Sequence, residues 1–341
     1  MRKKKMGLRS NLFDYLFKGR QRTIILAVCA VIFTAGAVQA KPLMFGHTVP
    51  PTHVWHKVAV KFADNLATAS NGKMKVKVVP LQKLGNEPQL FSMAQSGAIT
   101  FSMLPVGFLS NREASLLGWF LPYLFDDVAQ AGAAARLPAA LQMLKNLEPH
   151  GVVGLGYTFA GMQHVLSVAP VNSPADLTNK KIRTFPSPIF NDWWHVLGAA
   201  PTALPLAEIA PSLTTNLLDA AAVDLDIIVG LKYHQQAKYL ALTNHMAFPS
   251  VVFTCKKWWE GLSDAERDMV SKAFREAEEY GIDVQIKAEV SNLEKLAKDG
   301  AEVNHIDLAP FKAKANQIYE KYTTQNALIR QFADEVKAKQ K

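Results

Sequence analysis

Residues 176–201 read DLTNKKIRTFPSPIFNDWWHVLGAAP and combine a strand pattern with a helix pattern. Residues 181–185 form a short strand-like run, which two prolines bring to an end. Apolar side chains then recur at helical spacing in residues 189–197, and Gly198 closes that run. A strand that leads into a helix is the repeating unit of α/β sheets, so this stretch predicts an α/β fold.

Arg183 lies near the end of this predicted strand. Strand ends of open α/β sheets border the crevice in which such folds bind ligands. A guanidinium group stays charged and offers a planar fork that matches a carboxylate with two parallel hydrogen bonds. We therefore interpret Arg183 as a candidate clamp for an organic acid. An ordinary surface arginine is the alternative that the local sequence leaves open.

Strand and helix patterns alternate along most of the chain, which predicts helix-covered, mostly parallel sheets. We expect strands at residues 41–47, 73–79, 99–104, 151–159, 163–167, 181–185, 199–204, 220–225 and 251–254. We expect helices at residues 54–69, 87–96, 127–146, 189–197, 206–217 and 308–337.

A long helix is predicted from Ser263 to about Asp299, where Gly300 ends it. Ser263 and Glu266 have the spacing of a capping box, which marks a helix N-terminus. One lobe of this protein does not need a helix of that length. Our hypothesis is that the helix spans two lobes, and two separated pieces without contact to the second lobe would contradict it.

The first forty residues have the pattern of an export signal. Eight basic residues and one acid precede an apolar run at residues 23–38, and Val38-Gln39-Ala40 resembles a cleavage site. The apolar run is shorter than the ~20 residues of a spanning helix. We expect residues 1–40 to be a cleaved signal peptide and the protein to be periplasmic. An uncleaved anchor and a lipoprotein site at Cys29 are the alternatives.

The charge of the chain belongs mostly to this segment. The whole chain carries +9 and residues 1–40 carry +8 − 1 = +7, which leaves about +2 for residues 41–341. Nucleic-acid binding requires a basic face on the folded domain, so we expect no nucleic-acid partner.

Sequence signatures of enzymes and metal sites are missing. The chain has no Gly-x-Ser-x-Gly, His-Glu-x-x-His, Cys-x-x-Cys or phosphate-binding glycine loop. His47, His53 and His56 form a local group, but no nearby Cys or acid completes a ligand set. We expect no metal, no cofactor and no catalysis; a periplasmic hydrolase or lyase is the weakest alternative.

Short motifs follow one another along nearly the whole chain after Ala40. They are Leu84-Gly85-Asn86, Leu121-Pro122-Tyr123, Asp176-Leu177-x-x-x-Lys181-Ile182-Arg183, Leu197-Gly198-Ala199-x-Pro201, Leu204-Pro205-Leu206-Ala207-Glu208, Thr215-Asn216-x-x-Asp219, Tyr233-His234-x-x-Ala237-Lys238-Tyr239, Leu242-Thr243-Asn244-His245, and Trp258-Trp259 before Leu262-Ser263. No one motif is specific, but their order and spacing resemble the substrate-binding proteins of TRAP transporters, the DctP family.

This resemblance implies a two-lobed, periplasmic-binding-protein-like α/β fold with a ligand cleft between the lobes. We expect the first lobe to comprise residues 41–160 and 249–288, and the second to comprise residues 161–248 and 289–341. The resemblance implies that Arg183 holds the carboxylate of a small organic acid while the lobes close. The acid is then delivered to a TRAP membrane permease that an ion gradient drives.

Departures from the family pattern bear on the ligand. Gln163 occupies a position at which many members carry a second arginine, and Val223 one at which many carry asparagine. One positive charge and an apolar lining favour a monocarboxylate, with a ring or alkyl body, over a dicarboxylate or sugar acid. Trp193 offers stacking area, and core packing is its alternative role. The expected ligand-binding residues are Arg183, Gln163, Leu206, Val223, Ser250, Glu87 and Trp193.

Two further expectations concern partners. We expect a monomer, although some relatives of the family pair through a C-terminal helix. The alternative function is that of a periplasmic sensor that presents its organic acid to a membrane receptor, and sequence does not separate it from transport.

Overall fold

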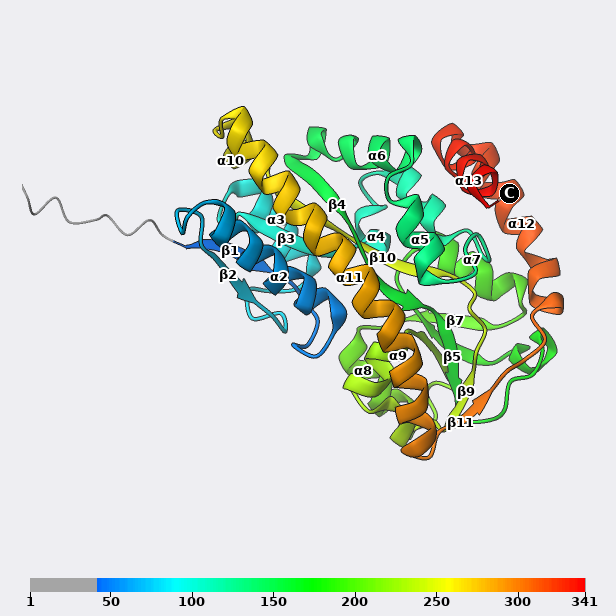
Figure 1. Ribbon diagram of the computed structural model, residues 1–341. Helices are drawn as coiled ribbons and strands as arrows, with labels where there is room; N and C mark the ends of the chain where they lie inside the picture. Colours follow the sequence, from blue (N-terminus) through cyan, green and yellow to red (C-terminus); the bar gives the residue numbers. More distant parts are fainter. Residues whose placement is uncertain (1–41, 341) are drawn as a thin grey trace, which may run out of the picture. The chain divides into compact units, whose positions relative to one another are not determined.

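The computed structural model describes residues 42–340, which contain two separate β-sheets with helices packed around them (Figure 1). The signal peptide predicted at residues 1–40 lies outside the described residues. The fold is therefore the mixed α/β architecture that the sequence predicts. It has the two sheets expected of a two-lobed binding protein.

The first sheet has one strand reversed against four parallel ones. Its strands, in spatial order, are β2 (Val76–Val79), β1 (Leu43–Gly46), β3 (Phe101–Pro105), β10 (Ala247–Cys255) and β4 (Val152–Met162). β10 is the reversed strand, because it runs antiparallel to both β3 and β4.

The second sheet follows the same rule. Its strands, in spatial order, are β11 (Glu302–Asn304), β9 (Tyr239–Ala241), β5 (His164–Ser167), β8 (Ala220–Val223), β6 (Lys181–Thr184) and β7 (Ala200–Ala203). Here β5 is the reversed strand. Both reversed strands are the first that the chain forms after it changes sheets, from β4 to β5 and from β9 to β10. Only Gln163 separates β4 from β5.

Helices accompany both sheets. Around the first lie α2 (Val54–Ala69), α3 (Glu87–Ser96), α4 (Val106–Leu109), η1 (Ala114–Phe120), α5 (Val128–Ala134), α6 (Pro138–Lys145), η2 (Glu148–His150) and α10 (Lys256–Glu260). The chain of the second sheet contributes η3 (Pro174–Leu177), α7 (Pro188–Val196), α8 (Leu206–Thr214), α9 (Leu225–Gly230) and η4 (Tyr233–Gln235). The predicted bounds of α2 and α3 are confirmed.

Two predicted helices are each divided into two. The helix expected at residues 127–146 breaks at Leu137, which is extended because Pro138 disfavours the helical conformation in the residue before it. The helix expected at residues 308–337 breaks at Asn326 into α12 (Ala309–Gln325) and α13 (Ala327–Lys339). Asn326 is extended, and its side chain accepts the N–H groups of Leu328 and Ile329 as an N-cap.

The long helix α11 (Asp264–Lys298) is continuous over 35 residues, and its predicted capping box at Ser263 is present. It packs against α2, β4 and α5 over much of its length and against α9 and β11 toward its C-terminal end (Figure 1). The hypothesis that one helix links the two lobes is confirmed. The predicted lobe boundaries stay a prediction. They assign α13 to the second lobe, and α13 packs against η1 and α6, which lie around the first sheet.

Candidate functional site

A cavity of about 280 Å³ is lined by residues that come from elements of both sheets. The first sheet and the loops and helices around it contribute Thr48, Val49, His53, Trp55, Gln82, Glu87, Pro88, Pro105, Phe108 and Phe248. The crossing and the second sheet contribute Gln163, Arg183, Phe185, Pro186, Ala203, Leu204, Pro205, Leu206, Val223, Asp224 and Ile227. The cavity is thus a cleft between the two lobes, at strand ends where α/β sheets bind ligands.

Arg183 is the cation of this cleft. It sits on β6, between β7 and β8, and is only 5% exposed. Its Nε donates to the carbonyl oxygen of Leu204 at 3.0 Å, and its Nη1 donates to that of Ala222 at 3.2 Å. Because these carbonyls follow or belong to the neighbouring strands, the sheet itself orients the guanidinium group. The remaining N–H groups have no acceptor within residues 42–340.

No counter-ion contacts the guanidinium group within residues 42–340. No carboxylate of the described residues lies within 4.0 Å of it. Burial lowers the pKa of Arg183 to about 10, with Tyr233, Asp224 and Glu87 acting in the opposite direction. Arg183 therefore remains charged at neutral pH. A buried cation without a partner is costly, and an entering anion would remove that cost.

Apolar and aromatic side chains form much of the wall. Phe185 and Phe248 pack edge to face with ring centroids 5.5 Å apart, and Trp55 stacks on Phe248 at 5.9 Å. Prolines and Leu206 add further apolar surface. Such walls bind the body of a small ligand, while the few polar groups orient it.

The structure brings five of the seven predicted site residues together in this cavity: Arg183, Gln163, Leu206, Val223 and Glu87. Gln163 is held at the crossing, where its N–H donates to the carbonyl oxygen of Met246 at 2.8 Å. Leu206 is fixed from behind, since the Tyr233 hydroxyl donates to its carbonyl oxygen.

Trp193 and Ser250 do not line the cavity. Trp193 is fully buried and packs against Tyr123 and Trp194, which corresponds to its alternative role in the core. Ser250 is also fully buried, within β10, where it is paired with Pro105 and Thr158. The sequence leaves both roles open for Trp193, and only the family resemblance places Ser250 in the pocket, because local sequence does not show which neighbour covers a side chain.

Sequence reasoning missed the acid next to the clamp. Asp224 lines the cavity and is the N-cap of α9, where its Oδ1 accepts the N–H of Ile227 at 2.9 Å. The sequence prediction extended the preceding strand through residue 225 and so hid this cap. An Asp directly before a helical run is the signal that could have revealed it.

The predicted histidine group makes structural contacts near the cleft. His53 is the N-cap of α2, and its Nδ1 accepts the N–H of Trp55 at 3.1 Å. Burial lowers the pKa of His53 to about 3, so the ring is neutral. His47 and His56 contact each other through ring nitrogens 3.0 Å apart. In the part of the chain that the structure describes, no group of three or more His, Cys, Asp or Glu residues is arranged to hold a metal.

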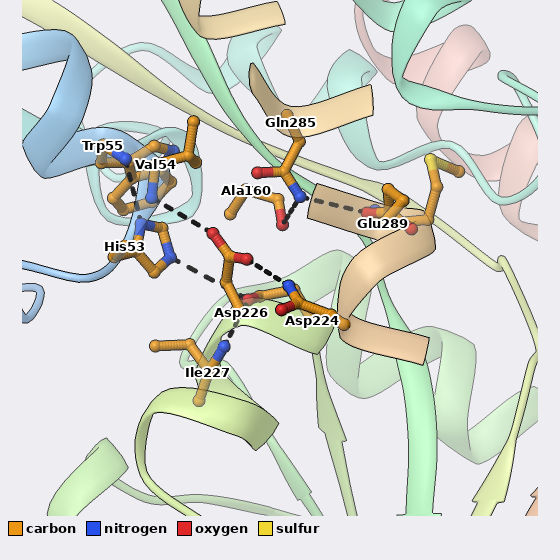
Figure 2. A network of polar contacts seen from close by, with 11 residues as sticks. His53, Val54, Trp55, Ala160, Asp224, Asp226, Ile227, Gln285 and Glu289 are labelled. Carbon is orange, nitrogen blue, oxygen red and sulfur yellow. Dashed lines mark hydrogen bonds and ion pairs between the residues drawn. The ribbon is translucent and has the colours of Figure 1, made fainter. Parts of the chain in front are cut away.

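Asp226 links three elements around the cleft (Figure 2). Its Oδ2 accepts the N–H of Val54, the first residue of α2, at 3.1 Å. Its Oδ1 accepts from the side-chain amide of Asn292 on α11 at 2.5 Å. One carboxylate on α9 thus joins the second lobe to the first and to the long helix.

Comparison with known proteins identifies the family. The sequence pattern of the bacterial extracellular solute-binding proteins, family 7 (DctP), matches residues 45–326. The chain belongs to family 7. Family 7 proteins are the solute-binding components of TRAP transporters, which bind small acids and work with membrane permease subunits. The family is a transport component rather than an enzyme class.

Relatives of this family 7 protein agree in length and fold. The 2,3-diketo-L-gulonate-binding periplasmic protein YiaO of Escherichia coli is 29% identical over 310 residues, which cover 89% of this chain and 94% of YiaO. A TRAP periplasmic solute-binding protein of Xanthobacter autotrophicus, solved with bound β-D-galacturonate, is 28% identical with a TM-score of 0.81, and the match covers 87% of this chain and 99% of that one.

A TRAP periplasmic solute-binding protein of Bordetella bronchiseptica, solved with density interpreted as pantoate, has the same identity of 28% and TM-score of 0.81. That match covers 86% of this chain and 99% of the Bordetella chain. Within residues 42–340 of this family 7 protein, no helix combines the length and the apolar character that crossing a membrane requires.

Proposed function

We propose that this protein is a monomeric periplasmic binding protein that captures a small monocarboxylate and delivers it to a TRAP-type permease. The observation that carries the proposal is the buried guanidinium of Arg183, which faces a cleft between two lobes and has no contacting counter-ion among the described residues. A ligand carboxylate there would gain a charge-assisted, two-pronged contact in a site that excludes water. Closure follows because a ligand that touches both lobes binds the closed form better.

Charge in the cleft supports one carboxylate rather than two. Arg183 is the single Lys or Arg among the residues that line the cavity, and Glu87 and Asp224 line it as well. A second ligand carboxylate would meet these acids instead of a cation. Apolar walls around Phe185 and Phe248 favour a ring or a branched alkyl body. The Bordetella relative was solved with density interpreted as pantoate, which carries one carboxylate. The Xanthobacter relative binds galacturonate, a sugar acid with one carboxylate, so it supports a single carboxylate but not the expected preference over sugar acids.

A thermal-shift panel of organic acids tests the proposal, because ligand that binds only the folded state raises the melting temperature. We expect stabilisation by monocarboxylates and little by matched dicarboxylates. Calorimetry of the best acid should give a Kd of about 10 nM to 10 μM. A dicarboxylate that binds much more tightly than every monocarboxylate would contradict the monocarboxylate preference. Recovery of a chemically altered acid would contradict a binding role.

A further inference from the structure

We propose that Asp224 is a specificity-determining residue that hydrogen-bonds an uncharged polar group of the ligand, such as a hydroxyl or carbonyl, and excludes a second anionic group. This inference rests on the proposed carboxylate site at Arg183. It adds a second polar anchor to the same cleft and assigns it to a residue that the family comparison does not single out.

The position of Asp224 places it beside the clamp. Asp224 directly follows β8, and the carbonyl of Ala222, two residues earlier, accepts a hydrogen bond from Arg183. Both side chains line the same cavity. They are not joined as an ion pair, since no Arg183 nitrogen lies within 4.0 Å of an Asp224 oxygen. A ligand can therefore contact both groups at once.

One oxygen of Asp224 is committed to the protein and the other is available. Oδ1 caps α9 by accepting the N–H of Ile227. Within the described residues, no group of another residue makes a hydrogen bond to Oδ2. The His53 Nε2 lies 3.9 Å from Oδ1, which exceeds hydrogen-bond distance (Figure 2).

The charged and titratable groups around Asp224 do not supply a cation in contact with it. Asp226 of α9 and Glu289 of α11 are acids, and His53 of α2 is neutral. Arg183 of β6 and Tyr233 of η4 complete the surroundings. Asp226 is already bonded to Val54 and Asn292. The cluster is thus a buried group of acids, with Arg183 nearby but not in ion-pair contact with Asp224.

Such surroundings keep Asp224 protonated at neutral pH. Burial, with Asp226 adding to it, raises the pKa of Asp224 to about 8. Because Oδ1 accepts the Ile227 N–H, the proton belongs on Oδ2, which can then donate to a ligand oxygen. A second ionised carboxylate of the ligand beside this group would be buried near Asp226 and Glu289, while Arg183 is engaged by the first carboxylate, and would be rejected.

Three related acids separate these roles: pantoate, which carries a hydroxyl next to its carboxylate; 3,3-dimethylbutanoate, which lacks the hydroxyls; and 2,2-dimethylsuccinate, which carries a second carboxylate. Calorimetry on the exported, dialysed protein at pH 6 should show pantoate binding about tenfold more tightly than either of the others. Absence of binding by all three acids would contradict the proposed function as well as this inference.

Two variants of Asp224 isolate the residue. Asp224→Asn keeps the N-cap acceptor and a donor but has no charge, so it should retain the preference for pantoate. Asp224→Ala should reduce that preference to less than about threefold, since one hydrogen bond accounts for about tenfold. A preference for pantoate that persists in Asp224→Ala would overturn the role of Asp224 while leaving the Arg183 site intact.

The pH dependence gives an independent readout. With a pKa of about 8, Asp224 is mostly ionised at pH 9, while Arg183 with a pKa of about 10 is mostly charged. Wild-type affinity for pantoate should fall about tenfold between pH 6 and pH 9, and Asp224→Asn should abolish the fall. Asp219→Asn is the matched control, since Asp219 precedes the same strand outside the cavity and should behave as wild type. An equal fall in Asp224→Asn would overturn the inference.

Discussion

Arg136 and Arg183 both bind protein oxygens, but the oxygens differ in charge. Arg136, between α5 and α6, forms an ion pair with the buried carboxylate of Glu278 on α11, and its side chain is 40% exposed. Arg183 is 5% exposed and, among the residues that the structure describes, donates only to the neutral carbonyls of Leu204 and Ala222. The first arginine completes the charge balance of the fold. Arg183 keeps a positive charge that those carbonyls do not neutralise. This difference indicates that Arg183 binds an external anion.

Removal of the guanidinium group should have the largest effect on ligand affinity, and it should differ between the two arginines. Arg183→Ala should weaken binding of the best acid by about 2–5 kcal/mol, because a buried ligand carboxylate would lose its partner. Arg136→Ala should leave affinity unchanged within about threefold, since Arg136 does not line the cavity. Calorimetry of both variants with one acid checks this prediction, and near-normal affinity of Arg183→Ala would remove the clamp assignment.

Substitution of each arginine by lysine separates the role of charge from that of geometry, because lysine keeps the charge but loses the planar fork. Arg183→Lys should lose about tenfold in affinity, since an ammonium group cannot both satisfy two fixed carbonyls and bind a carboxylate bidentately. Arg136→Lys should melt within about 2 °C of wild type at pH 7, because its half-exposed pair needs mainly charge. Equal affinity of Arg183→Lys and wild type would show that charge alone suffices in the cleft.

The smallest expected effect concerns stability rather than binding. Burial raises the pKa of Glu278 to about 7, although Arg136 acts against the shift. The folded protein therefore holds a proton that the unfolded chain releases above its ordinary pKa of 4.5, so this residue lowers stability as pH rises from about 4.5 to 7. Arg136→Ala should raise that pKa further. It should cost about 1 kcal/mol at pH 8 and less at pH 5, after allowance for the exposure of Arg136.

Denaturant unfolding at the two pH values measures this cost, and Glu278→Gln provides the control. When Arg136→Ala is combined with Glu278→Gln, the extra cost at pH 8 should disappear, because no buried carboxylate remains to be ionised. A cost that stays the same at both pH values, or that survives in the Glu278→Gln background, would show that Arg136 acts through packing and not through its charge.

Local signals explain how far the sequence predicts the fold. The bounds of α2 and α3 follow from apolar periodicity and end signals, and the capping box at Ser263 fixes the start of α11. Periodicity alone carried the predicted helices across Leu137 and Asn326, where Pro138 and an extended asparagine divide them. The order of strands within each sheet depends on pairing between distant segments, which local pattern does not contain.

The sequence likewise predicts some residues of the candidate site and not others. Arg183 could be predicted because a lone arginine at a strand end has a specific chemical use, and family spacing added Gln163, Leu206 and Val223. Asp224 could not be predicted as a ligand-binding residue. Its proposed role depends on burial beside Asp226 and on the absence of a contacting cation among the described residues. The direction in which Trp193 points likewise depends on the helices packed around α7.

A crystal structure of the exported protein with the acid that binds it most tightly tests the central claim most directly. We expect two carboxylate oxygens of that acid within about 3 Å of the Arg183 guanidinium nitrogens, with the bonds to Leu204 and Ala222 retained. An acid whose carboxylate lies elsewhere in the cavity, with Arg183 bonded only to those two carbonyls, would contradict it.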